Sequence, residues 1–438
     1  MNKIAITFVI VLLTLSVIIR LDYTQDSGQI ANEETKQDNA TAYIQEVNHY
    51  DSGFMLSNIK YIKDNTLSLK DNRLIAAIIN GDVVQVKKLL NECEEDILYH
   101  YHFNNQEFKL PIVFIAIGSN NDELINTVLS HEKIDKNITA NIMLYDKDGN
   151  AITTNISPLA YAVYINNITL AEILIKTGAD VNKKLTGNRT AMFYVNSKAG
   201  LELLEKYGAD INAVSVQGNT PLIHSIIRNN VFAAFEFIAK GSNPNQLNHA
   251  NATPLTIAIN NNNISMVKML LANGADSNFF SPESYSPLMA AVANSDLQTF
   301  HLLLNMGADA NAENKLGRTC IYYMQSFNEQ WTIWRGMIEA LADTININHQ
   351  DINGDTVLHI NPERYLLYKE LKPDLNIQNK NGDTPLHHLV KKTKNPDMVK
   401  LFIKDGANIQ IKNKANQTAL DIAKLNNNQK IIAILENH

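Results

Sequence analysis

The chain has 438 residues, of which 45% are hydrophobic and 19% are charged, a balance typical of folded proteins. Its formal net charge is −7 and it contains no run of Lys or Arg. This argues against nucleic acid as a partner, because binding to phosphates needs a basic surface.

The N-terminus carries an apolar segment at residues 4–19, preceded by Lys3 and closed by Arg20. Its sixteen residues are short for a membrane span, which needs about 17–25, but they fit the core of a signal peptide. Small residues suited to cleavage are poorly placed after Ile19. We therefore interpret residues 1–21 as an uncleaved signal anchor, with a cleaved signal peptide as the alternative. The simplest topology leaves the short end inside and exports the rest.

Two further segments precede the main part of the chain. Residues 22–42 are poor in apolar residues and rich in Asp, Glu, Gln and Asn, so we expect a disordered tether. Apolar residues return in residues 43–71. We expect that stretch to form an N-terminal cap over the domain that follows, because the end units of stacked repeats need a polar outer face.

A short phrase recurs about every 33 residues from there on. Thr or Ser, usually followed by Pro and Leu, opens the phrase, and the intervals between openers are 33, 30, 33, 33, 33, 37, 28 and 34 residues. Such a period indicates stacked repeats rather than one globular core. The openers are Ser157, Thr190, Thr220, Thr253, Ser286, Thr319, Thr356, Thr384 and Thr418.

Each repeat predicts a helix, a turn, a second helix and a loop. The opener can cap a helix whose first turn accommodates Pro, as at Thr253-Pro254. In the second helix of that unit, Met266, Val267, Leu270 and Leu271 should face inward, and Gly274 should end the helix in a left-handed conformation. Tight turns with positive φ are expected where Gly or Asn lies two residues before an opener: Gly218, Asn251, Gly317, Gly354, Gly382 and Asn416.

These phrases resemble the ankyrin-repeat family. Thr384-Pro385-Leu386-His387 matches its opener, and Gly-Ala-Asp-x-Asn closers start at Gly178, Gly208, Gly274 and Gly307. The resemblance implies an all-α solenoid of about eleven helix-turn-helix units with β-hairpin loops over residues 72–438, ending in a C-terminal cap at residues 418–438. It also implies that His359 and His387 are structural residues bonded within the repeat loops.

Two departures from the repeat are informative. The step to Ser157 is 14 residues too long, and apolar residues flank an Asp-Gly turn inside it, so residues 138–156 are predicted to form a β-hairpin finger. The finger is either a specific partner contact or a tolerated insertion. The lengthened Thr319 unit holds the only tryptophans, Trp331 and Trp334, which we expect to fill its core, with a binding hot spot as the alternative.

Motifs for chemistry are weak, and we predict no catalytic, cofactor-binding or metal-binding residues. His100 and His102 lie near Cys93, and a metal site there is a minor alternative. The start of a calcium loop at residues 146–150 fails, because Ala151 replaces the required Gly. Cys93 and Cys320 belong to distant units, so no disulfide is expected between them.

The resemblance therefore implies a non-enzymatic solenoid that binds a partner protein on a concave face of loop tips and first helices. We expect a monomer without cofactors, tethered to the membrane through residues 4–19 with its repeats in the periplasm, or else secreted. Its use would be that of an inhibitor or immunity protein for a toxic enzyme, or of an effector that an intracellular bacterium delivers to host proteins. The leading partner-binding candidates are Arg189, Gln217, Asn219, His249, Tyr285, Arg318, Asp355 and Asp383, and other loop candidates are Asn188, Asn251, Ser284, Leu316, Asn353 and Asn381.

Overall fold

A computed structural model describes residues 72–92, 98–103, 106–145, 151–324, 331–393 and 395–438. The predicted anchor, tether and N-terminal cap all lie outside these residues, as does the Asp-Gly turn of the finger. Among the described helices, none is long and apolar enough to cross a membrane.

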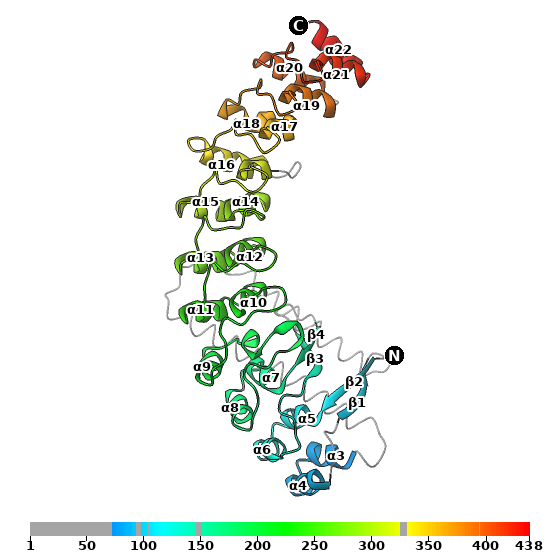
Figure 1. The fold of residues 1–438 in the computed structure, drawn as a ribbon, viewed down its shortest axis with the longest axis vertical. Coiled ribbons are helices and arrows are strands. Elements are labelled where there is room, and N and C mark those ends of the chain that lie inside the picture. Colours follow the sequence, from blue (N-terminus) through cyan, green and yellow to red (C-terminus); the bar gives the residue numbers. More distant parts are fainter. Residues whose placement is uncertain (1–71, 93–97, 104–105, 146–150, 325–330, 394) are drawn as a thin grey trace, which may run out of the picture. The chain divides into compact units, whose positions relative to one another are not determined.

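The described residues form eleven successive helical units, most of them a pair of short helices (Figure 1). This confirms the predicted helix-turn-helix repeat. In chain order the units are α3 (Asn72–Asn80) with α4 (Val83–Glu92), α5 (Ile112–Gly118) with α6 (Asp122–Ser130), α7 (Pro158–Tyr164) with α8 (Ile168–Lys176), η2 (Ala191–Tyr194) with α9 (Lys198–Lys206), α10 (Pro221–Ile227) with α11 (Val231–Ala239), α12 (Pro254–Asn260) with α13 (Ile264–Ala272), α14 (Pro287–Ala293) with α15 (Leu297–Asn305), η3 (Cys320–Tyr323) with α16 (Trp331–Leu341), α17 (Val357–Ile360) with α18 (Tyr365–Tyr368), α19 (Pro385–Lys392) with α20 (Pro396–Lys404), and α21 (Ala419–Leu425) with α22 (Gln429–Glu436). Single 3₁₀ turns η1 (Thr186–Asn188), η4 (Pro362–Arg364) and η5 (Lys369–Leu371) lie between them.

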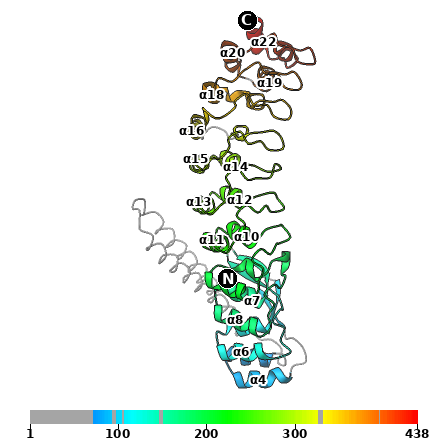
Figure 2. The ribbon, with the colours of Figure 1, turned by 60° about the vertical axis from the view of Figure 1, so that its left-hand side comes forward.

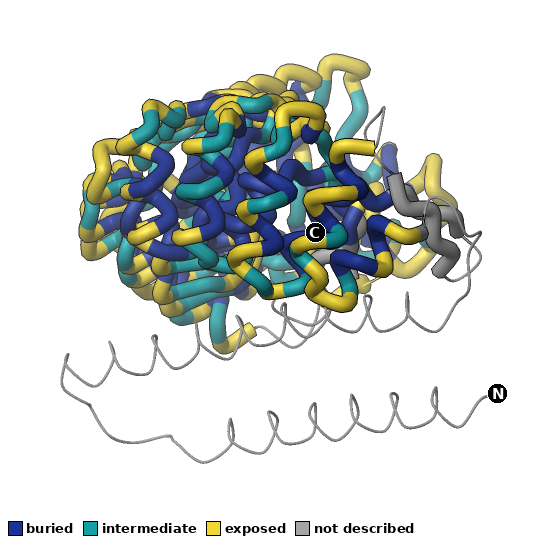
Figure 3. The backbone as a smooth tube through the Cα atoms, turned by 90° about the horizontal axis from the view of Figure 1, so that it is seen from below, coloured by how far each residue is buried: buried dark blue, intermediate teal, exposed yellow. Residues whose placement is uncertain are grey.

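Neighbouring units stack with equivalent helices in contact. First helices pack against first helices, as α10 does on α12 and α19 on α21, and second helices pack against second helices, as α11 does on α13. The long loops lie along one side of the first helices and the second helices along the other (Figure 2). Buried segments run through the middle of the stack (Figure 3). Met266, Val267, Leu270 and Leu271 of α13 are all buried, as their spacing predicted.

The openers cap the first helices as predicted. The side chains of Ser157, Thr220, Thr253 and Ser286 accept the backbone N–H three residues on, and Pro follows each in the first turn. Two of the four openers that lack a following Pro behave differently. Thr190 and Thr319 precede the single 3₁₀ turns η2 and η3, and their buried hydroxyls have no hydrogen-bond partner among the described residues.

The glycines and asparagines before the openers have left-handed backbones. Gly218, Asn251, Gly317, Gly354, Gly382 and Asn416 have φ angles between 59° and 75°, and Gly274 has a φ of 90°. The predicted positive φ is thus confirmed at every one of these positions. At Gly382 a side chain would also clash, because a Cβ atom would lie 2.8 Å from the backbone nitrogen of Lys414 in the next loop.

Two antiparallel hairpins accompany the first units. Strands β3 (Ala140–Tyr145) and β4 (Ala151–Ile156) pair from Ala140 with Ile156 to Tyr145 with Ala151, within the predicted finger. A second hairpin of β1 (Leu98–Phe103) and β2 (Gln106–Pro111) precedes α5, and β2 contacts β3. This second hairpin was not predicted, because no Asn-Gly or Asp-Gly turn lies between its strands.

The tryptophans of α16 have different environments. Trp334 is 4% exposed, and the guanidinium carbon of Arg364 lies 4.5 Å from the centre of its ring. Trp331 is 46% exposed, so the prediction that both fill the core is wrong for this residue. The reason is its place at the first position of the helix, one turn before the buried stripe of Trp334, Met337, Ile338 and Leu341 begins.

Candidate partner-binding surface

Six of the loops that join consecutive units are organised by one polar side chain, which lies five residues before the opener. We call these residues the loop anchors. Asn379 is representative: its Oδ1 accepts the backbone N–H groups of Asn381 at 2.9 Å and Asp383 at 3.0 Å. Asn or Asp favours such turns because its side chain can accept from the backbone two residues on. The other anchors are Ser215, Asn248, Asn314, Asp351 and Asn413.

Most anchors also bind the residue that precedes the previous opener. Asn379 Nδ2 donates to Asp355 Oδ1 at 2.7 Å. Asn413 Nδ2 donates in the same way to Asp383 Oδ1 at 2.8 Å. Where the anchor is a carboxylate, the partner is a cation, since Arg318 Nε donates to Asp351 Oδ2 at 3.1 Å. At four anchors, Asn248, Asp351, Asn379 and Asn413, a matched pair of side chains therefore links two successive loops.

Backbone bonds between successive loop tips reinforce these pairs. Lys380 N–H donates to the carbonyl of Asn353, and Lys414 N–H donates to that of Asn381, both at 2.9 Å. No such donor exists at Pro282, the equivalent position in the loop before Ser286, because proline has no N–H. The tips of the last loops are consequently fixed relative to one another before any partner arrives.

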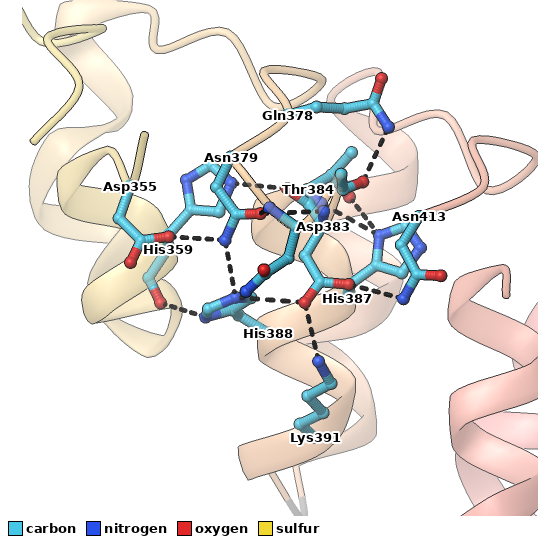
Figure 4. Close-up of polar contacts among 12 residues, drawn as sticks. Asp355, His359, Gln378, Asn379, Asp383, Thr384, His387, His388, Lys391 and Asn413 are labelled. Carbon is cyan, nitrogen blue, oxygen red and sulfur yellow. Dashed lines mark hydrogen bonds and ion pairs between the residues drawn. The ribbon is translucent and has the colours of Figure 1, made fainter. Parts of the chain in front are cut away.

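The histidines of the openers complete the network (Figure 4). His359 Nδ1 accepts the backbone N–H of Thr356 at 3.0 Å, and its Nε2 donates to the carbonyl of Asp383 at 2.9 Å. His387 repeats the arrangement with Thr384 and the carbonyl of Gln417. Both rings bond within the repeat loops, as expected. Burial lowers the pKa of each imidazole below its usual value.

The closing phrases form a second set of links at the opposite end of each unit. Asn278 Nδ2 donates to the carbonyl of Gly307 at 2.9 Å, and its Oδ1 accepts the N–H of Asp309 at 2.7 Å. Asn182, Asn245, Asn311 and Asn376 make the same two bonds to the following unit. Many of the chain's asparagines thus connect neighbouring units.

Two of the eight leading candidates prove to be buried. Asp355 is 9% exposed and Asp383 4% exposed, in contrast to the exposed loop positions that we expected for them. The physical reason is that each of these two carboxylates binds the anchor of the next loop, Asp355 through Asn379 and Asp383 through Asn413. In Asp383, burial raises the pKa, but hydrogen bonds from Lys391 and Asn413 outweigh it and leave the pKa below its usual value.

The other six candidates remain accessible to different degrees. Gln217, His249 and Tyr285 are exposed at the loop tips. Arg189, Asn219 and Arg318 are half-buried, and the side chain of each forms a hydrogen bond in the loops. Arg189 donates to the carbonyl of Thr186, Asn219 accepts from the side chain of Asn248, and Arg318 donates to the carboxylate of Asp351.

Aromatic side chains lie beside some of these residues. Tyr285 packs edge-on against Tyr323, with ring centroids 4.7 Å apart, so its ring is held in place although 45% of the residue is exposed. The guanidinium carbon of Arg189 lies 5.7 Å from the centre of the Tyr194 ring. Tyr and Arg in fixed positions are typical of binding hot spots.

Three exposed apolar residues were not among the predicted candidates. Val216 and Ile352 lie four residues before their openers and are 57% and 49% exposed, and Phe279 is 39% exposed. The shared offset of Val216 and Ile352 from the opener was the available signal, since His249, at the same offset, was chosen. The accessible surface therefore contains apolar residues in addition to Leu316, the one aliphatic residue among the loop candidates.

A metal-binding arrangement is absent from the part of the chain that the structure describes, where no three His, Cys, Asp or Glu residues gather suitably. The minor metal alternative at Cys93, His100 and His102 lies outside the described side chains. Cys320 is buried, and burial raises the pKa of its thiol to about 12, which makes it unreactive.

Comparisons with known proteins agree with the repeat pattern. A family model described as ankyrin repeats matches residues 190–281, 226–314 and 364–438. The chain is also similar to an ankyrin repeat protein of Rickettsia felis, with 36% identity over 112 residues. That match covers 22% of this chain and 48% of the relative, so it spans about half of the relative's length.

Proposed function

We propose that this chain, whose residues 190–314 and 364–438 match ankyrin repeats, is a non-enzymatic scaffold that binds a partner protein along its loop tips and first helices. One observation carries the proposal. The anchors and the residues before the openers hold the loop backbones, while the tip side chains, such as Gln217, His249 and Ile352, are left exposed.

Loops with a fixed backbone and exposed tip side chains are suited to protein recognition. Binding costs less entropy when the recognising backbone is already ordered, and the tips of successive loops are linked by direct hydrogen bonds. Tyr285, with its ring packed on Tyr323, and the apolar Val216 and Ile352 offer the kind of side chains that contribute most in interfaces.

A crosslinking and capture experiment tests the binding face. The full chain would be used to isolate its partner, and affinity would then be measured for His249→Ala and Tyr285→Ala. We expect Tyr285→Ala to weaken binding by about tenfold or more, as hot-spot truncations do. Glu202→Ala and Lys268→Ala, at exposed positions of α9 and α13, serve as controls. Losses confined to the control variants would place the interface on the second helices and contradict the proposal.

We further propose that residues 4–19 tether the protein in a membrane, with the repeats on the periplasmic side; the secreted form is the alternative. The support is the uncharged stretch between Lys3 and Arg20 and the polar segment after it. Fractionation with protease access and N-terminal sequencing tests this. A membrane-bound intact chain with digestible repeats is expected, a soluble chain that begins beyond residue 20 would favour secretion, and repeats protected in the cytoplasm would contradict both.

Two biological uses follow from these locations. A periplasmic binder suits an inhibitor or immunity protein, which should copurify with one enzyme and abolish its activity. A secreted binder suits an effector, which should be found outside the bacterium in complex with host proteins. The relative from Rickettsia felis is bacterial, in keeping with either use.

A further inference from the structure

The last two units of the stack differ in charge from the rest of the chain. Residues 376–438 contain ten lysines and five acidic residues, which gives a formal charge of +5. Since the whole chain carries −7, residues 1–375 carry −12. The C-terminal end is therefore basic although the net charge of the whole chain is negative.

Most acidic groups of this end already have a cationic partner. Asp383 pairs with Lys391, Asp397 with Lys400, Asp405 with Lys369, and Glu436 with Lys424, at N–O distances between 2.7 and 3.3 Å. The fifth, Asp421, accepts hydrogen bonds from Thr418. The remaining lysines thus have few carboxylates of their own chain to neutralise them.

Three of these lysines belong to the loops. Lys380 and Lys414 each lie four residues before an opener, at the loop tips, and Lys412 lies just before the anchor Asn413. All three are exposed, and none forms an ion pair with a carboxylate that the structure describes. We call Lys380, Lys412 and Lys414 the tip lysines.

The backbones of the tip lysines are fixed in a row. The backbone N–H of Lys414 donates to the carbonyl of Asn381, and that of Lys380 donates to the carbonyl of Asn353. The side chain of Gln378 donates to the carbonyl of Lys412 at 3.0 Å. Adjacent tips should lie about 10 Å apart, the usual spacing of packed helices. The same row continues to Ile352, at the equivalent position in the preceding loop, which is 49% exposed.

We propose that the tip lysines bind an acidic segment of the partner protein, rich in Asp and Glu, with an apolar side chain placed over Ile352. The inference rests on the proposed function and specifies the chemistry of the partner. A short segment fits better than a membrane surface or a nucleic acid, because those extended anions would also meet the strongly acidic remainder of the chain. Complementary charge should act mainly on the association rate and the specificity.

Fluorescence anisotropy with the full chain tests the proposal. The probe is a labelled peptide with Glu at every third position and a Leu at one end, and a peptide with Gln in place of Glu is the matched probe. The test variant is Lys380→Glu with Lys414→Glu. The control is Lys404→Glu with Lys430→Glu, which changes the charge of the same two units equally on the exposed faces of α20 and α22. Circular dichroism checks that both variants remain folded.

We expect the Glu peptide to bind the wild-type chain and the control variant alike, and to bind the tip variant about tenfold more weakly or worse, because like charges then face each other. The Gln peptide should not bind, and the Glu peptide should dissociate as salt rises. Equal losses in both variants would indicate general attraction to a basic end and overturn the inference. So would preferential binding of anionic phosphatidylserine vesicles or of a DNA oligonucleotide. If the Glu peptide fails while the captured partner still depends on Tyr285, this inference fails and the proposed function stands.

Discussion

Removal of the Asn379 side chain should destabilise the C-terminal units strongly, because one amide links two loops. In Asn379→Ala the backbone N–H groups of Asn381 and Asp383 lose their acceptor, and the Asp355 carboxylate loses a donor at 2.7 Å. Two backbone bonds at about 1 kcal/mol each and one charged bond at about 2 kcal/mol total about 4 kcal/mol. Water that enters from the loop side offsets part of this, so we expect a loss of about 3 kcal/mol.

The matched control lies two residues away. Asn381 is exposed at the tip of the same loop, and only its backbone groups take part in the bonds described above, so Asn381→Ala should change stability by less than about 0.5 kcal/mol. Urea unfolding monitored by circular dichroism gives the free energies, and amide exchange at Asn381 and Asp383 reports the local opening. Equal shifts of the urea midpoint in the two variants would refute the role assigned to the anchor.

Charge at the same position offers a second test of this reasoning. Asn379→Asp keeps both backbone acceptors but places a carboxylate against Asp355, whereas the native carboxylate of Asp351 faces Arg318. We expect Asn379→Asp to be destabilising and the addition of Asp355→Asn to restore stability, since the amide then donates from the other loop. Failure of the double variant to recover any stability would contradict the proposed matching of anchors and partners.

Three further outcomes are expected. Gly382→Ala should destabilise by about 2 kcal/mol, because φ is 75° and the new Cβ would meet Lys414 N at 2.8 Å. Gly406→Ala, with a φ of 106° but no atom within 4 Å, should cost less, and equal melting temperatures would contradict the steric argument. Stability should fall as the pH drops below about 6.5, because burial and the nearby Arg228 lower the pKa of His224 to about 3 and unfolded His then binds protons that the folded state does not. Between pH 7.5 and 5 the protonation of His224 in the unfolded state should lower the free energy of unfolding by about 2 kcal/mol. Urea unfolding of His224→Asn at the two pH values should lack this difference. Arg364→Ala should expose Trp334 to acrylamide quenching and destabilise the unit by about 1–2 kcal/mol, whereas Trp331→Ala should leave stability unchanged within about 0.5 kcal/mol.

Local chemistry determined a large part of this protein. Thr253 and Ser286 cap helices and Gly218 and Gly382 adopt positive φ because each effect depends on a few consecutive residues, which any reader of the sequence can see. The stacking of units followed as well, since the period places the apolar positions of each helix, such as Met266 and Leu270, on one face.

Tertiary structure decided what those local patterns leave open. Asp355 and Asp383 look like ordinary loop residues, and only the position of the next loop, 24 or 30 residues on, shows that they are buried partners of Asn379 and Asn413. The 3₁₀ turns after Thr190 and Thr319 likewise depend on what the neighbouring units leave room for. The sequence alone thus determined the repeat, because capping and turn preferences act over short distances. The accessible surface depended on contacts between repeats, which no single repeat encodes.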